Sequence, residues 1–176
     1  MKNPKSNMKY IAFLRGINVG GNTMLSMQEL VLLFIDAGLT NVHTYINSGN
    51  VMFESNHSEV KLKESLEKVV REKKGKDIPV VIRSAKELHS ILSHNPFPSA
   101  HPSKVGVMLL TKPVAKSIMD DVINIGIEEI VLARREIYIH FPNGMGRSKL
   151  KFRTTGEAGT VRNINTIRKL VELSSI

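Results

Sequence analysis

The stretch NVHTYINSGNVMFES (residues 41–55) decides the fold that this sequence predicts. Two short segments that suit β-strands stand on either side of the tetrapeptide NSGN. Asparagine, serine and glycine at such a place are typical of a tight turn between two strands. We therefore expect a β-hairpin here. The segments on each side of it indicate the fold to which the hairpin belongs.

A strand and a helix are expected before the hairpin, and a helix and a strand after it. A capping box, Ser26 with Glu29, predicts the start of the first helix, and Gly75 is a natural stop for the second. The expected order is β-α-β-β-α-β, which is that of ferredoxin-like folds. The segments outside the hairpin are strand MKYIAFLRGI (8–17), helix 26–37, helix 58–74 and strand IPVVIR (78–83).

We expect a similar series of elements after the proline-rich stretch HNPFPSAHP (94–102). The three prolines forbid a helix or a central strand there. The predicted elements around it are helix 84–92 with the capping box SAKE, strand KVGVMLL (104–110), a helix from Pro113 to about residue 124, a hairpin at 128–141 and helix 165–173.

The predicted fold is therefore α+β, with two ferredoxin-like (βαββαβ) halves that are pseudo-duplicated and packed as one compact unit. We expect a flexible arm at residues 1–7, a first half with its following helix at residues 8–94, and a second half with a C-terminal helix at residues 103–176.

Composition limits the possible functions. The chain has 176 residues and a net charge of +9, and it contains no cysteine, which excludes disulfides, thiolate catalysis and cysteine-bound metals. No apolar run is long enough to span a bilayer and the first residues do not resemble a signal peptide, so we expect a cytoplasmic protein. The positive charge attracts phosphates and polyanions, or it forms a solvated basic surface.

The glycine-containing stretch LRGINVGGNT (residues 14–23) differs from the phosphate-binding P-loop pattern at one residue, because Asn22 stands where that pattern has lysine. The expected helix starts several residues later, whereas a P-loop places its last residues in the first turn of a helix. We therefore interpret Gly20 and Gly21 as residues that permit a close backbone approach.

Four motifs stand out along the chain: YIAFLRGINVGG, YINSGNVMF, SKL at residues 148–150 and TVRNINTIRKL at residues 160–170. In these motifs the chain resembles a bacterial family of uncharacterised proteins, domain of unknown function 1697. The motifs extend over nearly the whole chain from Met8 onward. The resemblance implies an α+β fold of two ferredoxin-like halves and no known activity. Within the last motif this chain has Ile164, where the family usually has tryptophan.

The polar residues of these motifs are the candidate site. Arg162, just before a helix with Asn163 or Asn165 as its cap, would place a cation beside free backbone amides, which suits an anion. Asparagines that cap helices and arginines that tie loops together are the structural alternative. The predicted anion-binding residues are Arg15, Asn18, Asn50, Lys149, Arg162, Asn163 and Asn165.

Enzyme patterns are weak in this sequence. Ser48 with His43 has no evident orienting acid, and the six histidines show no metal-binding spacing, so we expect no metal and no cofactor. Aromatic residues make up only 5% of the chain, and Phe13 and Phe53 are expected in the core, which argues against base stacking by an RNA-recognition sheet.

The sequence therefore favours a binding module for an anionic or phosphate-bearing small ligand. Three alternatives stay open: a self-association or protein-interaction module without catalysis, an enzyme acting on a small phosphorylated substrate, and an unspecific nucleic-acid binder.

Overall fold

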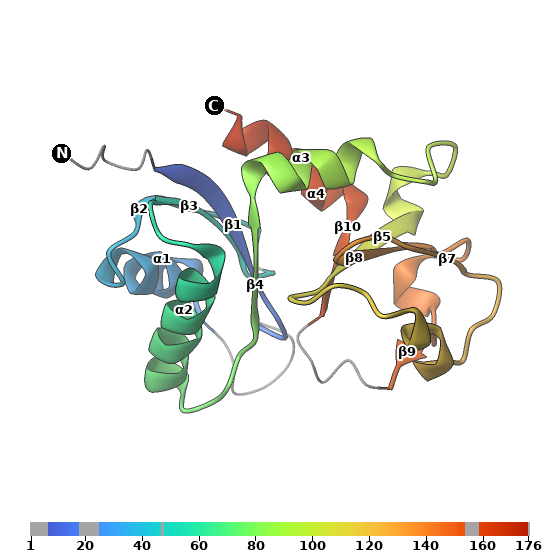
Figure 1. The fold of residues 1–176 in the computed structure, drawn as a ribbon, viewed down its shortest axis with the longest axis horizontal. Helices are drawn as coiled ribbons and strands as arrows, with labels where there is room; N and C mark the ends of the chain where they lie inside the picture. The colour runs from blue at the N-terminus through green and yellow to red at the C-terminus, as the bar shows by residue number, and fades with distance from the viewer. Residues whose placement is uncertain (1–6, 18–24, 47, 154–158, 176) are drawn as a thin grey trace. The chain divides into compact units, whose positions relative to one another are not determined.

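The computed structural model of the chain describes residues 7–17, 25–46, 48–153 and 159–175. It is a mixed α+β protein built on antiparallel sheets (Figure 1). The chain divides into two units, residues 1–87 with 173–176 and residues 88–172. Within the described ranges, no helix is both long and apolar enough to cross a membrane. The predicted arm (except residue 7), Asn18, Gly20 and Gly21 lie outside the described residues.

The first unit contains a four-stranded antiparallel sheet in the order β2-β3-β1-β4. The hairpin that decides the fold is confirmed, as are the helix before it and the helix after it. The elements are β1 (Met8–Leu14), α1 (Met27–Asp36), β2 (Thr40–Tyr45), β3 (Asn50–Ser55), α2 (Glu59–Lys74) and β4 (Val80–Ser84).

The first helix of this unit starts, and the second stops, where its capping residues predict. Ser26 Oγ accepts a hydrogen bond from the Glu29 backbone N–H (3.1 Å), and the Glu29 carboxylate accepts one from the Ser26 N–H (2.9 Å). These bonds from Ser26 lower the pKa of Glu29. Helix α2 is capped by Ser58 and ends at Gly75, whose φ of 65° is in the left-handed region that favours glycine.

Strand β1 lies in the middle of this unit and is buried on both faces. Tyr10, Ala12 and Leu14 point to a core that α1 and α2 cover, and Figure 1 shows both helices on one side of the sheet. The alternate residues Ile11 and Phe13 are also buried. The helix residues buried in the core are Leu30 and Phe34 of α1 and Leu62, Leu66 and Val70 of α2.

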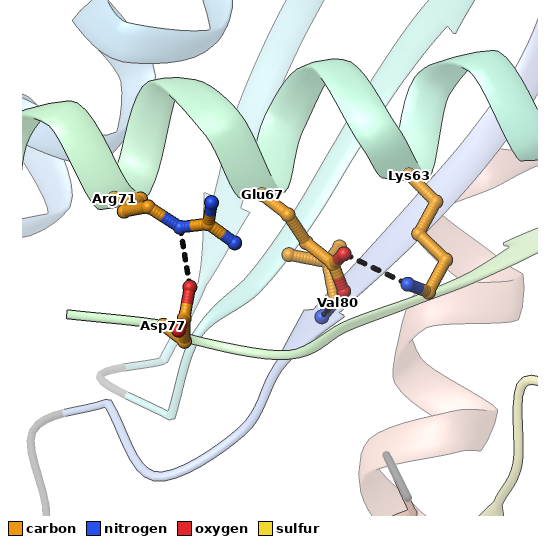
Figure 2. Close-up of polar contacts among 5 residues, drawn as sticks. All are labelled: Lys63, Glu67, Arg71, Asp77 and Val80. Atoms are coloured by element: carbon orange, nitrogen blue, oxygen red, sulfur yellow. Dashed lines mark hydrogen bonds and ion pairs between the residues drawn. The ribbon is translucent and has the colours of Figure 1, made fainter.

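A half-buried carboxylate ties α2 to the strand that follows it (Figure 2). Glu67 accepts a hydrogen bond from the backbone N–H of Val80, the first residue of β4 (3.0 Å), and pairs with Lys63 one turn earlier (2.8 Å). One turn later, Arg71 donates a hydrogen bond to Asp77. The helix therefore supplies the acceptor for a backbone donor at the start of the strand.

The second unit contains a four-stranded antiparallel sheet in the order β10-β5-β8-β7 and a separate two-stranded sheet, β6-β9. Helix α3 precedes β5, and α4 follows β10 directly. The strands are β5 (Val105–Leu109), β6 (Val122–Ile123), β7 (Glu129–Leu132), β8 (Glu136–His140), β9 (Lys151–Phe152) and β10 (Thr160–Asn163); the α-helices are α3 (Ala85–Ser93) and α4 (Ile164–Ser174); the 3-10 helices are η1 (Pro102–Lys104), η2 (Lys116–Asp121) and η3 (Met145–Arg147).

The predicted α-helix from Pro113 to about residue 124 is wrong. The segment forms only the 3-10 helix η2 and then strand β6, which pairs with β9. The prediction rested on Pro113, which suits the first position of a helix. In the structure Val114, Ile118 and Val122, which are four residues apart, pack against the core of this unit. However, η2 has no side-chain cap, and β-branched residues follow it, so strand pairing prevails over a continued helix.

The two sheets share one register. In the first unit Ile11 of β1 lies opposite Met52 of β3 and Arg83 of β4. In the second unit Val107 of β5 lies opposite Tyr138 of β8 and Arg162 of β10. These residues of the first sheet thus have counterparts in the second. In the described part of the second unit, however, the connections between strands contain no α-helix.

Replacing Gly49 by alanine should destabilise the protein strongly. Gly49 has a φ of 76°, and an added Cβ would lie 2.3 Å from Ile17 Cγ2 and 3.2 Å from the Leu14 carbonyl oxygen. Gly38 is the matched control, because its φ of 83° carries the same strain but its Cβ would meet open space. We expect Gly49→Ala to cost about 1–3 kcal/mol more than Gly38→Ala in urea unfolding. Equal losses would contradict the close contact.

Replacing Glu67 by alanine should lower the free energy of unfolding by about 1–3 kcal/mol, because the Val80 N–H loses its acceptor. Glu67→Gln keeps an acceptor oxygen and should cost less than about 1 kcal/mol. Glu72→Ala is the control, since Glu72 belongs to an exposed pair with Lys68 at 3.9 Å. Equal effects of the alanine and glutamine variants in urea unfolding would show that only the ion pair matters.

Candidate functional site

Two of the sequence-predicted site residues lie at one end of the first sheet. Arg15 follows β1 and is half-buried, and its backbone N–H donates to the Pro79 carbonyl (3.0 Å). Asn50 begins β3 and is fully buried, and its side-chain amide donates to the Tyr45 carbonyl (3.1 Å) and to Ser48 Oγ (2.7 Å). The amide of Asn50 therefore braces the hairpin turn.

Three more predicted residues meet where β10 runs into α4. Arg162 is half-buried and donates to Thr160 Oγ1 (2.6 Å), and burial lowers its pKa to about 10, so the guanidinium stays charged at neutral pH. Asn163 accepts from the Asn165 N–H (2.9 Å), which caps α4, while Asn165 accepts from the Arg168 guanidinium (3.2 Å).

Lys149 lies on a segment that its neighbour anchors. It is exposed, and the preceding residue Ser148 donates a hydrogen bond to the Glu128 carboxylate. That bond, followed by one from the Gly126 backbone N–H, lowers the pKa of Glu128. The serine of the SKL motif thus fixes the backbone that carries the lysine.

A pocket of about 470 Å³ opens over the first sheet, on residues that the site prediction did not include. Lys9 of β1 lies directly opposite Glu54 of β3, and His43 of β2 lies directly opposite Met52. Directly opposite residues share a sheet face, and this face is opposite to the one that α1 and α2 cover. The lining residues, all in the first unit, are Lys9, Tyr10, Asn41, His43, Thr44, Met52, Phe53, Glu54, Leu173 and Ser174.

The charged groups of this pocket are not committed to the fold. Lys9 and Glu54 are half-buried and His43 is exposed. Among the residues that the structure describes, none forms a hydrogen bond or an ion pair with these three side chains. A cation, a carboxylate and an imidazole therefore remain available to a bound molecule.

The equivalent face of the second unit is filled instead. The counterpart of Met52 is Tyr138, whose hydroxyl donates to the Ile91 carbonyl of α3 (2.8 Å). The counterpart of Glu54 is His140, which pairs with Glu129 (2.8 Å). In the second unit both of these side chains thus have partners within the fold, whereas in the first unit their counterparts line a pocket.

The sequence could have indicated this pocket through the register of the sheet. Successive side chains of a strand point to opposite faces of a sheet. Once the turn within residues 41–55 is placed, His43, Met52 and Glu54 must therefore share a face. Lys9 joins them because β1 pairs with β3, and that long-range pairing is not encoded in any local motif. Among the described residues, no group of histidine and acidic side chains could hold a metal ion.

Comparisons with known proteins agree on the fold and name no activity. The model of a family described as protein of unknown function, DUF1697, matches residues 8–138. Among solved structures, the chain is similar to the conserved bacterial protein SP0830 from Streptococcus pneumoniae, with 22% sequence identity and a TM-score of 0.80 over 97% of this chain and 100% of that one. At this identity the similarity shows the fold alone. No curated protein sequence matches the chain.

Removing the Ser148 hydroxyl should raise the pKa of Glu128 toward its usual value. The wild-type interaction favours the ionised carboxylate, so it stabilises the fold above the usual pKa of glutamate and is lost as the pH falls through the lowered one. Ser148→Ala should therefore lose less stability than the wild type on acidification. A carboxyl titration by NMR tests this, with exposed Ser117→Ala as control; an unchanged titration of Glu128 would contradict it.

Proposed function

We propose that this chain, which belongs to the DUF1697 family of proteins of unknown function, is a binding module for a small anionic ligand held in the pocket of its first unit. The observation that carries the proposal is the pair of opposite charges, Lys9 and Glu54, that stand side by side in this pocket without a described partner. Half-buried charges that the fold does not pair are expensive to keep unless a ligand uses them.

The chemistry of the pocket defines the class of ligand. The Lys9 ammonium offers donors to a carboxylate or phosphate, and the Glu54 carboxylate accepts from a hydroxyl or amino group. Met52 adds apolar surface, and the volume is in the range that suits small molecules. The proposed ligand therefore carries an anionic group and, a few bonds away, a hydroxyl or amino group. The net charge of +9 attracts such anions from a distance but does not select among them.

The sequence-predicted residues give the proposal a second location. Arg162 supplies a charged group at the start of α4, and Lys149 and Arg15 are the other cations of that set. The asparagines of the set, at positions 50, 163 and 165, already make hydrogen bonds within the fold. The pocket with Lys9 is therefore the stronger candidate, and the cations of the two locations can be removed separately.

An enzyme acting on a small phosphorylated substrate is the second candidate function, and His43 is the observation that favours it. An imidazole changes its charge near neutral pH, so a histidine beside a carboxylate in a ligand pocket is suited to proton transfer. In this proposal His43 and Glu54 move the proton while Lys9 holds the phosphate.

We also propose that the two units descend from one ferredoxin-like ancestor and that the protein acts in the cytoplasm. The common register, from Ile11 and Arg83 in one sheet to Val107 and Arg162 in the other, supports the duplication. The first unit kept its two connecting helices and an open face, and the second filled that face with Tyr138. On this view the ligand site arose in one copy only.

A thermal-shift screen tests the proposal. The panel contains inorganic phosphate, sugar phosphates, nucleotides, pyridoxal phosphate and short RNA and DNA, each at low and high salt. A ligand at 100 times its dissociation constant stabilises the native state by about 2.7 kcal/mol. We expect a salt-resistant shift with a small anion that Lys9→Met abolishes. Lys68→Met is the matched control, because it removes the same charge from an exposed position on α2.

Other outcomes would contradict the proposal that the pocket with Lys9 binds the ligand. A shift that survives Lys9→Met and disappears in Arg162→Met or Lys149→Met would move the site to the sequence-predicted residues. Shifts with nucleic acid alone that vanish at high salt would show unspecific binding by the basic surface. The absence of any shift would remove the support for a small-ligand module.

A further inference from the structure

The positive charge of the chain is missing from one continuous segment. The chain contains 25 lysines and arginines, yet none occurs between Arg15 and Lys61. The same segment contains the acidic residues Glu29, Asp36, Glu54 and Glu59. It provides α1, β2 and β3 of the first unit. Helix α1 and strands β2 and β3 therefore carry no lysine or arginine of their own, although Lys73 and Lys74 of α2 lie near Glu29.

The outer side of α1 within this segment is apolar. Leu32 is 57% exposed and Ile35 is 50% exposed, and Val31 beside them is half-buried. The opposite side of the same helix buries Leu30 and Phe34 in the core. A helix that is apolar all round is normally covered on every side.

A groove lies beside this exposed ridge. It has a volume of about 410 Å³ and is formed by Met27, Gln28, Val31 and Leu32 of α1 with Thr44 of β2. Strand β2 is at the edge of the sheet, but its register shifts between Thr40 and His43, which leaves little regular edge for another strand to extend. The helix and its groove, rather than the strand edge, are therefore the surface to be covered.

We propose that a second copy of this chain covers this surface by packing its own α1 antiparallel against the first, around a two-fold axis near Leu32. Two chains of charge +9 repel each other, and this surface brings together elements, α1 and β2, that carry no lysine or arginine of their own. Leu32 is near the middle of α1, so a two-fold axis there lets each Leu32 enter the groove of the other copy.

The charges at the ends of α1 favour the antiparallel orientation. Asp36 is exposed at the last position of the helix, which has no basic residue in its last turn. In an antiparallel pair Asp36 comes close to the N-terminus of the other α1, where the helix dipole favours a negative charge. A parallel pair would instead place the two Asp36 carboxylates together. The inference is independent of ligand binding, because it uses the outer side of α1 and none of the charged pocket residues.

The mass of the full chain in solution tests the proposal. We expect sedimentation equilibrium to show twice the mass of one chain at micromolar concentration. Leu32→Glu should raise the dissociation constant at least about tenfold, because the new carboxylate would be buried twice in the interface. Val60→Glu is the matched control, since Val60 is 68% exposed on α2 and outside the proposed surface. Circular dichroism confirms that both variants fold.

A disulfide test uses the absence of cysteine from this chain. In Leu32→Cys, the introduced thiols are the only ones present, so any disulfide must join two copies. We expect mild oxidation to trap a covalent dimer of Leu32→Cys and not of Val60→Cys. A single-chain mass throughout the micromolar range, a dimer that Leu32→Glu leaves unchanged, or a mass that grows without limit would each overturn the proposal.

Discussion

Strand β1 is hydrogen-bonded to β3 along one edge and to β4 along the other, and its central side chains are buried on both faces. A strand in this position leaves little freedom to the elements around it. The β3 partner fixes the hairpin, and the β4 partner fixes where α2 must end. Successive side chains of β1 point to opposite faces of the sheet. One is the core face, which α1 and α2 cover, and the other carries the pocket.

The start of β1 explains why the pocket contains charge. The apolar run of the strand begins at Tyr10, so Lys9 stands where the sheet leaves the core. Its partner Glu54 stands at the corresponding place on β3, near the end of that strand. Opposite charges at directly facing positions stabilise a sheet when they pair, but these two remain separate in the described structure. Their arrangement therefore suits recognition better than it suits stability.

Local signals in the sequence were sufficient to predict most of the helices and strands of the first unit. Ser26 with Glu29 and Ser84 with Glu87 are capping boxes in the structure, and Gly75 ends α2 in the left-handed conformation. These are interactions between residues close in the chain, which a sequence displays directly. The motif residues were recognised equally well, but their partners were not, because Asn50 and Asn163 make hydrogen bonds to residues of other segments as well as to near neighbours.

The wrong helix prediction after Pro113 and the missed pocket have a common physical origin. Pro113 suits the first position of a helix, but β6 pairs with β9, nearly thirty residues later, and a local signal alone cannot show that competition. The pocket escaped notice for the same reason, because Lys9 and Glu54 become neighbours only through a strand pairing that no motif announces. Long-range pairing decides both outcomes, and it is the property that a single sequence shows least.

The division of the chain into units has a consequence for its synthesis. The first unit includes residues 173–176, and α4 therefore begins in the second unit and ends in the first. A ribosome completes the whole of residues 88–172 before it adds those residues. Leu173 and Ser174, which help to line the pocket of the first unit, are therefore added only after the second unit has been synthesised. A gene cut between the two units would thus not yield two intact halves.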